Sequence, residues 1–121
     1  MRVLFILTAL VLFSGCSENQ ELTGPWEMWV LVSAPTVDDV WRCESPVGRA
    51  VRWAAVPGET VRCELLRDGE HVMELFDWQS SESGFFNVGT DLTEAGKGTG
   101  YQVVVIDDQG FYGVSEEFTI L

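Results

Sequence analysis

The fold is decided by residues 60–76, TVRCELLRDGEHVMELF. In Thr60–Arg67 positions 61, 63 and 65 are apolar and positions 62 and 64 are charged, which is the period-two pattern of a half-buried strand. The dipeptide Asp68-Gly69 follows, and it favours a tight turn between two antiparallel strands. His71–Phe76 is the returning strand. The stretch therefore predicts a β-hairpin.

Further short β-like runs lie on both sides of this hairpin, each bounded by proline, glycine or aspartate. They are Trp29–Ser33, Val40–Cys43, Ala50–Ala55, Phe85–Val88, Tyr101–Ile106 and Val114–Leu121. Tyr101–Ile106 is apolar on both faces and is predicted to be a central strand, whereas the glycines of Leu92–Gly100 indicate a loop. No helical periodicity follows residue 25. Residues 26–121 are therefore predicted to form an all-β, Ig-like antiparallel β-sandwich of about seven strands.

The N-terminal residues 1–16, MRVLFILTALVLFSGC, have the layout of a secretory signal peptide. A positive charge at Arg2 precedes the apolar run Val3–Phe13, and two small residues, Ser14 and Gly15, end it. The apolar run is well short of the roughly 20 residues that span a bilayer as a helix. We therefore expect residues 1–15 to be removed on export.

Cys16 stands directly after the small residues, which makes this segment resemble the signal of a bacterial lipoprotein. The resemblance implies cleavage before Cys16 and acylation of its thiol and amine, with residues 16–25 as a short tether. Several acyl chains give a lasting membrane anchor without a transmembrane helix. Ser17 at the next position favours the outer membrane, so the predicted location is the bacterial cell envelope. The alternative is an ordinary signal peptide with an incidental Cys16.

Charge and cysteine content narrow the possible partners. The chain has a formal net charge of −12 with scattered basic residues, which argues against nucleic acid and against electrostatic docking on anionic lipid. Membrane attachment would then come from Cys16 alone. If Cys16 is acylated, Cys43 and Cys63 remain as a pair, and an oxidising compartment favours a disulfide between them. Two separate buried thiols are the alternative.

Several stretches together make residues 30–121 resemble the Ig-like module of the Ser-Thr-rich, GPI-anchored KNH-like cell-wall family. They are VLVSAP at 30–35, Val51 with Trp53, VRCELLRDGE at 61–70, SGFF at 83–86, GYQVVV at 100–105 and GVSEEFTI at 113–120. The segment Glu44–Arg49 looks like an insertion in that pattern. The chain is also similar to fibronectin type III domains, which implies that Tyr101 occupies the tyrosine-corner position with its hydroxyl bonded back to the chain. The family implies an extracellular, non-enzymatic module associated with cell-wall carbohydrate.

Catalytic and metal-binding patterns are poorly represented. The single histidine, His71, has no accompanying nucleophile motif, so we interpret it as a surface histidine and expect no enzymatic activity. The pairs Asp38-Asp39 and Asp107-Asp108 offer oxygen ligands for Ca²⁺ but do not match a calcium loop. They are interpreted as solvated turn residues. No metal site and no cofactor are predicted.

Aromatic residues near predicted turns are the candidate binding residues, because they supply a large contact area with a polar end. They are Trp26, Trp78, Phe111 and Tyr112. Trp29 and Trp53 lie within strand patterns and are expected in the core. The leading hypothesis is a lipid-anchored envelope module that acts in adhesion or scaffolding through an unidentified envelope protein. The alternative is a carbohydrate-binding module for a cell-wall or surface glycan.

Overall fold

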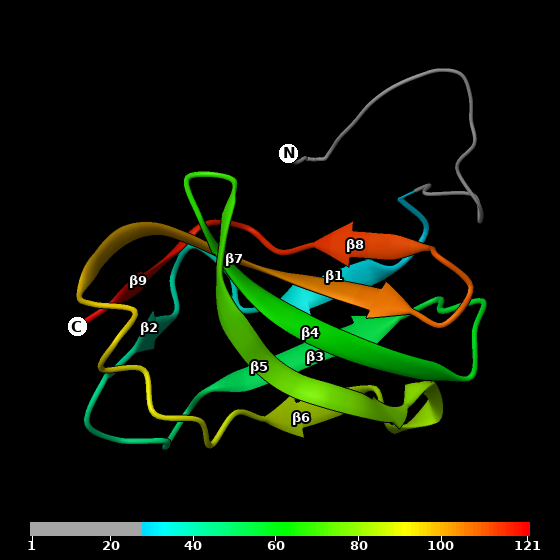
Figure 1. Cartoon of the computed structure of the whole chain (residues 1–121), viewed down its shortest axis with the longest axis horizontal. Helices are drawn as coiled ribbons and strands as arrows, with labels where there is room; N and C mark the ends of the chain where they lie inside the picture. The colour runs from blue at the N-terminus through cyan, green and yellow to red at the C-terminus, as the bar shows by residue number, and fades with distance from the viewer. Residues whose placement is uncertain (1–27) are drawn as a thin grey trace.

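The computed structural model describes residues 28–121, which form a two-layered β-sandwich (Figure 1). Residues 1–27 lie outside the described part, and with them the predicted signal peptide, Cys16, the tether and Trp26. Within residues 28–121 no helix is long and apolar enough to cross a membrane. The predicted all-β sandwich is confirmed.

The smaller layer has the strand order β1-β3-β6, and the larger one has the order β2-β9-β7-β4-β5, with β8 also paired to β7. The strands are β1 (Leu31–Ala34), β2 (Val40–Trp41), β3 (Ala50–Ala54), β4 (Thr60–Arg67), β5 (Glu70–Ser80), β6 (Phe85–Asn87), β7 (Gly98–Asp107), β8 (Tyr112–Val114) and β9 (Phe118–Ile120). A 3₁₀ turn, η2 (Ser81–Ser83), precedes β6. The chain thus crosses between the layers repeatedly, as in Ig-like sandwiches.

The hairpin predicted from residues 60–76 joins β4 and β5. Asp68 and Gly69 have φ of 52° and 84°, the pair of positive values that a two-residue hairpin turn requires. Strand β5 runs on to Ser80, four residues beyond the predicted end, so Trp78 lies within a strand, three residues before η2. The register between β4 and β5 shifts at three places.

Strand β7 is central, as predicted, because it pairs with β4 on one side and with β8 and β9 on the other. Its Tyr101 is fully buried. The hydroxyl of Tyr101 donates toward the carbonyl oxygens of Ala95 (2.5 Å) and Gly96 (2.7 Å). The predicted bond from this tyrosine back to the upstream chain is confirmed, and it fixes the loop before β7 to the core.

Three expectations about individual segments are wrong. Residues Val114–Leu121 do not form one strand: β8 and β9 are separated at Ser115–Glu117. Strand β2 pairs with β9 in parallel, so the larger sheet is mixed. Trp29 is 56% exposed and does not lie in the core, whereas Trp53 is buried as expected. Trp29 lies in the segment before β1 that pairs with β8, and its ring meets that of Phe111.

Candidate binding face

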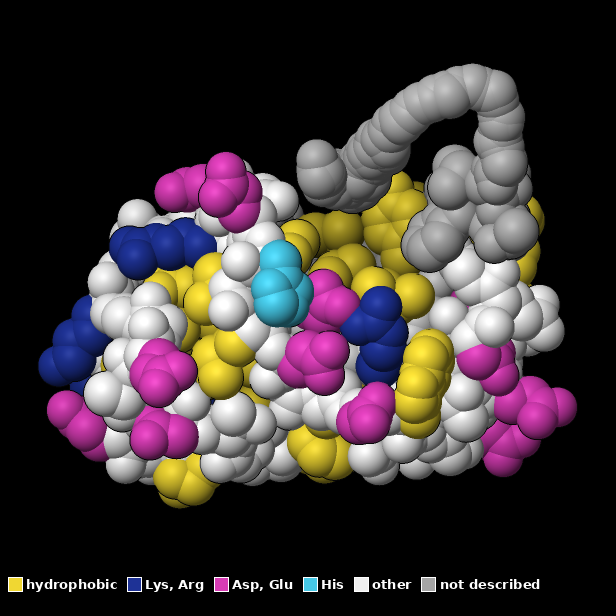
Figure 2. Space-filling model, in the orientation of Figure 1, with side chains coloured by type: hydrophobic (Ala, Val, Ile, Leu, Met, Phe, Trp, Pro, Cys, Tyr) yellow, Lys and Arg dark blue, Asp and Glu magenta, His cyan; other side chains and the backbone are white. Residues whose placement is uncertain are grey.

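The outer surface of the larger sheet presents a continuous set of side chains from four strands. In β4 the side chains of Val61, Cys63 and Leu65 are buried between the layers. Residues 62 and 64 therefore point outward, because side chains alternate across a strand. The register places them opposite outward residues of β7, which in turn are opposite outward residues of β8. Figure 2 looks onto this surface, where the only histidine lies among acidic side chains.

One row of this surface runs across the sheet from Tyr112 to Trp78. Tyr112 on β8 is opposite Ile106 on β7, and Ile106 is opposite Arg62 on β4. The guanidinium carbon of Arg62 lies 5.8 Å from the ring centre of Trp78 on β5. Trp78 is 45% exposed. Two aromatic side chains thus flank the row at roughly three strand spacings, about 14 Å, from each other.

The neighbouring row is charged on one side and aliphatic on the other. Val114, Val104, Glu64 and Glu74 follow one another across β8, β7, β4 and β5. Glu64 accepts a hydrogen bond from Arg62 through one oxygen. Its other oxygen lies 3.7 Å from Nε2 of His71. The carboxylate of Glu64 therefore joins the two rows and holds Arg62 beside Trp78.

We call this surface the open face and define it by the two rows and the adjacent histidine. Its residues are Tyr112, Ile106, Arg62, Trp78, Val114, Val104, Glu64, Glu74 and His71. Tryptophan, tyrosine and arginine are the residues that contribute most to binding free energy at protein interfaces. A tryptophan ring beside carboxylate and guanidinium groups can also stack on a sugar ring while those groups bond its hydroxyls. The open face is thus suited to binding.

The structure separates two of the sequence-predicted binding residues. Tyr112 belongs to the open face, but its neighbour Phe111 turns the other way, packs against the core and meets Trp29 edge-on at 6.0 Å. Trp78 and Tyr112 are therefore brought onto one surface, and Phe111 is not. The sequence pattern could have shown this, because adjacent residues of a strand face opposite sides.

The predicted disulfide is wrong: Cys43 and Cys63 are both buried free thiols. The backbone N–H of Cys43 donates to the carbonyl of Leu121. The preceding residue, Ile120, is opposite Gly98, so Cys43 lies near the start of β7. Cys63 is opposite Val105, seven residues further along β7. Seven strand residues span about 23 Å, and a disulfide requires Cα atoms within about 7 Å.

Asp107 is not the solvated turn residue that the sequence suggested, because it is 2% exposed. Its Oδ2 accepts a hydrogen bond from the N–H of Gly58 (2.7 Å). Its Oδ1 accepts from the N–H groups of Gln109 (2.9 Å) and Phe111 (2.8 Å). Asp39 likewise accepts from the N–H of Thr36 at 2.7 Å. Among residues 28–121, no three His, Cys, Asp or Glu side chains gather into a possible metal site.

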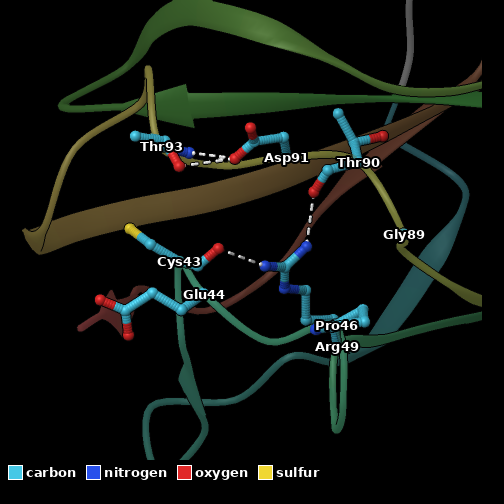
Figure 3. Close-up of a pocket in the computed structure, with 8 residues that line it drawn as sticks. All are labelled: Cys43, Glu44, Pro46, Arg49, Gly89, Thr90, Asp91 and Thr93. Atoms are coloured by element: carbon cyan, nitrogen blue, oxygen red, sulfur yellow. Dashed lines mark hydrogen bonds between the residues drawn. The ribbon is translucent and has the colours of Figure 1, made fainter.

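A depression of about 300 Å³ lies at one end of the sandwich (Figure 3), and Arg49 forms part of its lining. The Arg49 guanidinium donates to the carbonyls of Thr90 (2.5 Å), Arg42 (2.7 Å) and Cys43 (3.0 Å), and more weakly to Val88. Burial lowers the pKa of Arg49, while the nearby Asp91 carboxylate acts in the opposite direction. Hydrogen bonds from the hydroxyl and backbone of Thr93 lower the pKa of Asp91.

These contacts make Arg49 a clamp between two loops rather than a ligand-binding group. Four of its donor contacts go to backbone carbonyls of the β2–β3 and β6–β7 connections, so its charge is already solvated by the protein. Sequence reasoning missed this residue because it lies in the apparent insertion Glu44–Arg49. A single arginine in a loop carries no pattern that would mark it as buried.

No protein-family model matches the chain, and neither the curated proteins nor the solved structures contain a significant match. The resemblance to KNH-like and fibronectin type III modules therefore stays a prediction from the sequence.

Proposed function

We propose that the protein is a lipid-anchored module of the bacterial cell envelope that binds an envelope protein through the open face. The observation that carries this proposal is the row from Tyr112 to Trp78, in which Ile106 and Arg62 lie between a half-buried tyrosine and an exposed tryptophan. The half-buried Ile106 lies between them and supplies apolar area. The protein acts by adhesion or scaffolding, without catalysis.

The anchor is acylated Cys16, left at the N-terminus after removal of residues 1–15. This part of the proposal rests on the sequence alone, since residues 1–27 lie outside the described structure. Intact mass of the protein from the membrane fraction should show the loss of residues 1–15 and the added mass of acyl chains. A soluble product with a free Cys16 thiol, or a retained N-terminus, would contradict it.

Binding through the open face is tested by crosslinking from two positions in living cells. A photo-crosslinking residue at Glu74 should capture one defined envelope protein, and the same residue at Asn87 on the opposite layer should not. Trp78→Ala should abolish the capture. Phe85→Ala is the matched control, because Phe85 is 42% exposed on the other layer and also lies beneath an arginine, Arg52. Equal loss with both variants would overturn the assignment of the face.

Glycan recognition is the second candidate, and one observation favours it. The exposed Trp78 ring lies next to Arg62, which is bonded to Glu64, so a stacking platform adjoins paired hydrogen-bonding groups. Retention on a glycan array that Trp78→Ala or Tyr112→Ala removes would support sugar binding. Capture of a defined protein from Glu74 without any glycan signal would decide for scaffolding.

A further inference from the structure

The strands of the smaller layer contain no aspartate or glutamate. Their sequences are LVSA, AVRWA and FFN, and Arg52 is their only charged residue. Strands β4 and β5 of the other layer carry four carboxylates, at Glu64, Glu70, Glu74 and Asp77. Because the chain has 19 acidic and 7 basic residues, a set of strands without any negative charge is unusual in this protein.

This acid-free face is also apolar and exposed. Leu31 lies opposite Ala54, and Arg52 lies opposite Phe85. Leu31 is 60% exposed, and the Arg52 guanidinium carbon lies 4.9 Å from the ring centre of Phe85. Trp29 stands two residues before Leu31 at the edge of this layer, where it is exposed and its ring meets that of Phe111. We define the acid-free face as Trp29, Leu31, Arg52, Ala54 and Phe85.

The described chain begins at the edge shared by the two layers, where Met28 bridges Tyr112 of β8 and Val30 donates to the Tyr112 carbonyl, just before β1. Eleven residues, 17–27, lie between Cys16 and Met28, so the connecting chain reaches at most about 40 Å. Strand β1 is the first strand after the tether and forms one edge of the smaller sheet. An anchor at Cys16 would thus leave the acid-free face within reach of the lipid surface.

We propose that the acid-free face rests on the surface of the phospholipid bilayer. The proposal depends on the anchor at Cys16. Tryptophan favours the membrane–water interface, arginine binds lipid phosphate, and each buried apolar Å² adds about 25 cal/mol. The strands of this layer carry no carboxylate that anionic lipid would repel. The sequence alone assigned membrane attachment to Cys16. The structure adds a second contact that orients the domain, with the open face turned away from the bilayer.

The test compares one dye at two positions of the acylated full-length protein. Cys43 and Cys63 are buried and Cys16 is blocked by acylation, so a thiol-reactive, polarity-sensitive dye labels only an introduced cysteine. Ala54→Cys places it on the acid-free face and Glu74→Cys places it on the open face. The protein is reconstituted in vesicles of phosphatidylcholine with phosphatidylglycerol, some carrying a quencher at the headgroup level.

The dye at Ala54 should be blue-shifted and quenched several times more strongly than the dye at Glu74. Leu31→Glu with Phe85→Glu should remove the difference while the protein stays on the vesicles. Equal quenching at the two positions would overturn the proposal. A blue shift at Ala54 without quenching would mean that a second copy or another protein covers the face, and would also overturn it.

Flotation with the vesicles separates this inference from the proposed function. Protein that floats and shows equal quenching contradicts only the lipid contact, and the anchor stands. Protein that does not float lacks the anchor, and then the proposed location and the lipid contact fail together.

Discussion

Gly113 lies directly against the backbone of Val30, so that a Cβ built on Gly113 would stand 1.9 Å from the Val30 carbonyl oxygen. The N–H of Val30 donates to the carbonyl of Tyr112 at 3.1 Å. This close approach brings the segment before β1 onto β8, and it joins the two layers at the edge where the tether enters.

Gly113→Ala should destabilise the domain by about 3 kcal/mol or more, because neither backbone can move without breaking strand hydrogen bonds. Urea unfolding followed by tryptophan fluorescence measures the change. Gly89→Ala is the control, since a Cβ at Gly89 meets nothing within 4 Å, and it should change the free energy of unfolding little. Similar stability of the two variants would contradict the close packing at Gly113.

Tyr101→Phe should lower the free energy of unfolding by about 1–3 kcal/mol, because it leaves the carbonyls of Ala95 and Gly96 without their donor. Thermal unfolding of the two proteins measures it. Tyr112→Phe removes a hydroxyl from the half-buried open face instead and should have a smaller effect. If both substitutions cost the same, the tyrosine hydroxyl does not hold the loop before β7.

Asp107→Asn should cost about 2 kcal/mol or more, because an amide replaces one of the two oxygens that accept three backbone N–H groups. The loss should appear as faster hydrogen exchange at Gly58 and Phe111. Asp77→Asn, an exposed carboxylate on β5, serves as the control. Unchanged exchange at Gly58 in the Asp107 variant would contradict the bond to that amide.

Arg49→Lys should destabilise the domain by about 2 kcal/mol or more, because an ammonium group cannot reach both loops as the planar guanidinium does. Arg52→Lys is the matched substitution at an exposed arginine, and surface changes of this kind stay within about 0.5 kcal/mol. Chemical unfolding of the two variants tests the clamp. Equal stability would show that Arg49 does not connect the loops.

The two buried thiols predict both a labelling result and a pH dependence. With Cys16 blocked by the proposed acylation and no reductant present, the native protein should react with no thiol reagent, and the denatured protein should expose two thiols, Cys43 and Cys63. Burial raises the pKa of Cys63 well above its ordinary value of 9.0. Above that pH the unfolded chain therefore loses a proton that the folded protein keeps.

The free energy of unfolding should then fall as the pH rises beyond about 9, by up to about 1.4 kcal/mol per pH unit for this group. Cys63→Val should reduce that slope, and below pH 8 its offset from the native chain should be constant. An unchanged slope would contradict the buried, protonated thiol, and absence of labelling after denaturation would restore the disulfide.

Local signals in the sequence were sufficient for the hairpin and the central strand. Asp68-Gly69 specifies its turn through two positive φ values. In Tyr101–Ile106 the side chains of Tyr101, Val103 and Val105 face the core, and Val104 on the outer side is also buried. The expectation that Trp29 lies in the core was wrong, because an apolar, β-branched run has the same sequence pattern whether or not its side chains are covered. The predicted end of β5 was wrong because bulges in this edge strand interrupt the alternation of apolar and polar residues that would have shown residues 77–80 to be strand.

Contacts between segments that are distant in the sequence could not be predicted from the sequence. The pairing of Cys43 with Cys63 was inferred from their number, but the distance between them depends on the register of β7 against β4 and β9. The clamp at Arg49 depends on two loops that meet only in the folded chain. The open face could be anticipated only as separate aromatic residues, because its rows exist only once four strands are aligned.

The register shifts of β5 have a consequence for how the protein behaves at high concentration. An eleven-residue strand at the edge of a sheet is normally a template on which another chain can add. Each bulge bends the strand and increases its twist, so an incoming strand would lose its hydrogen-bond ladder after a few residues. Glu70, Glu74 and Asp77 repel a second copy of the same strand. The longest free edge of the domain is thereby protected against aggregation, and its neighbour, the open face, stays accessible to a different molecule.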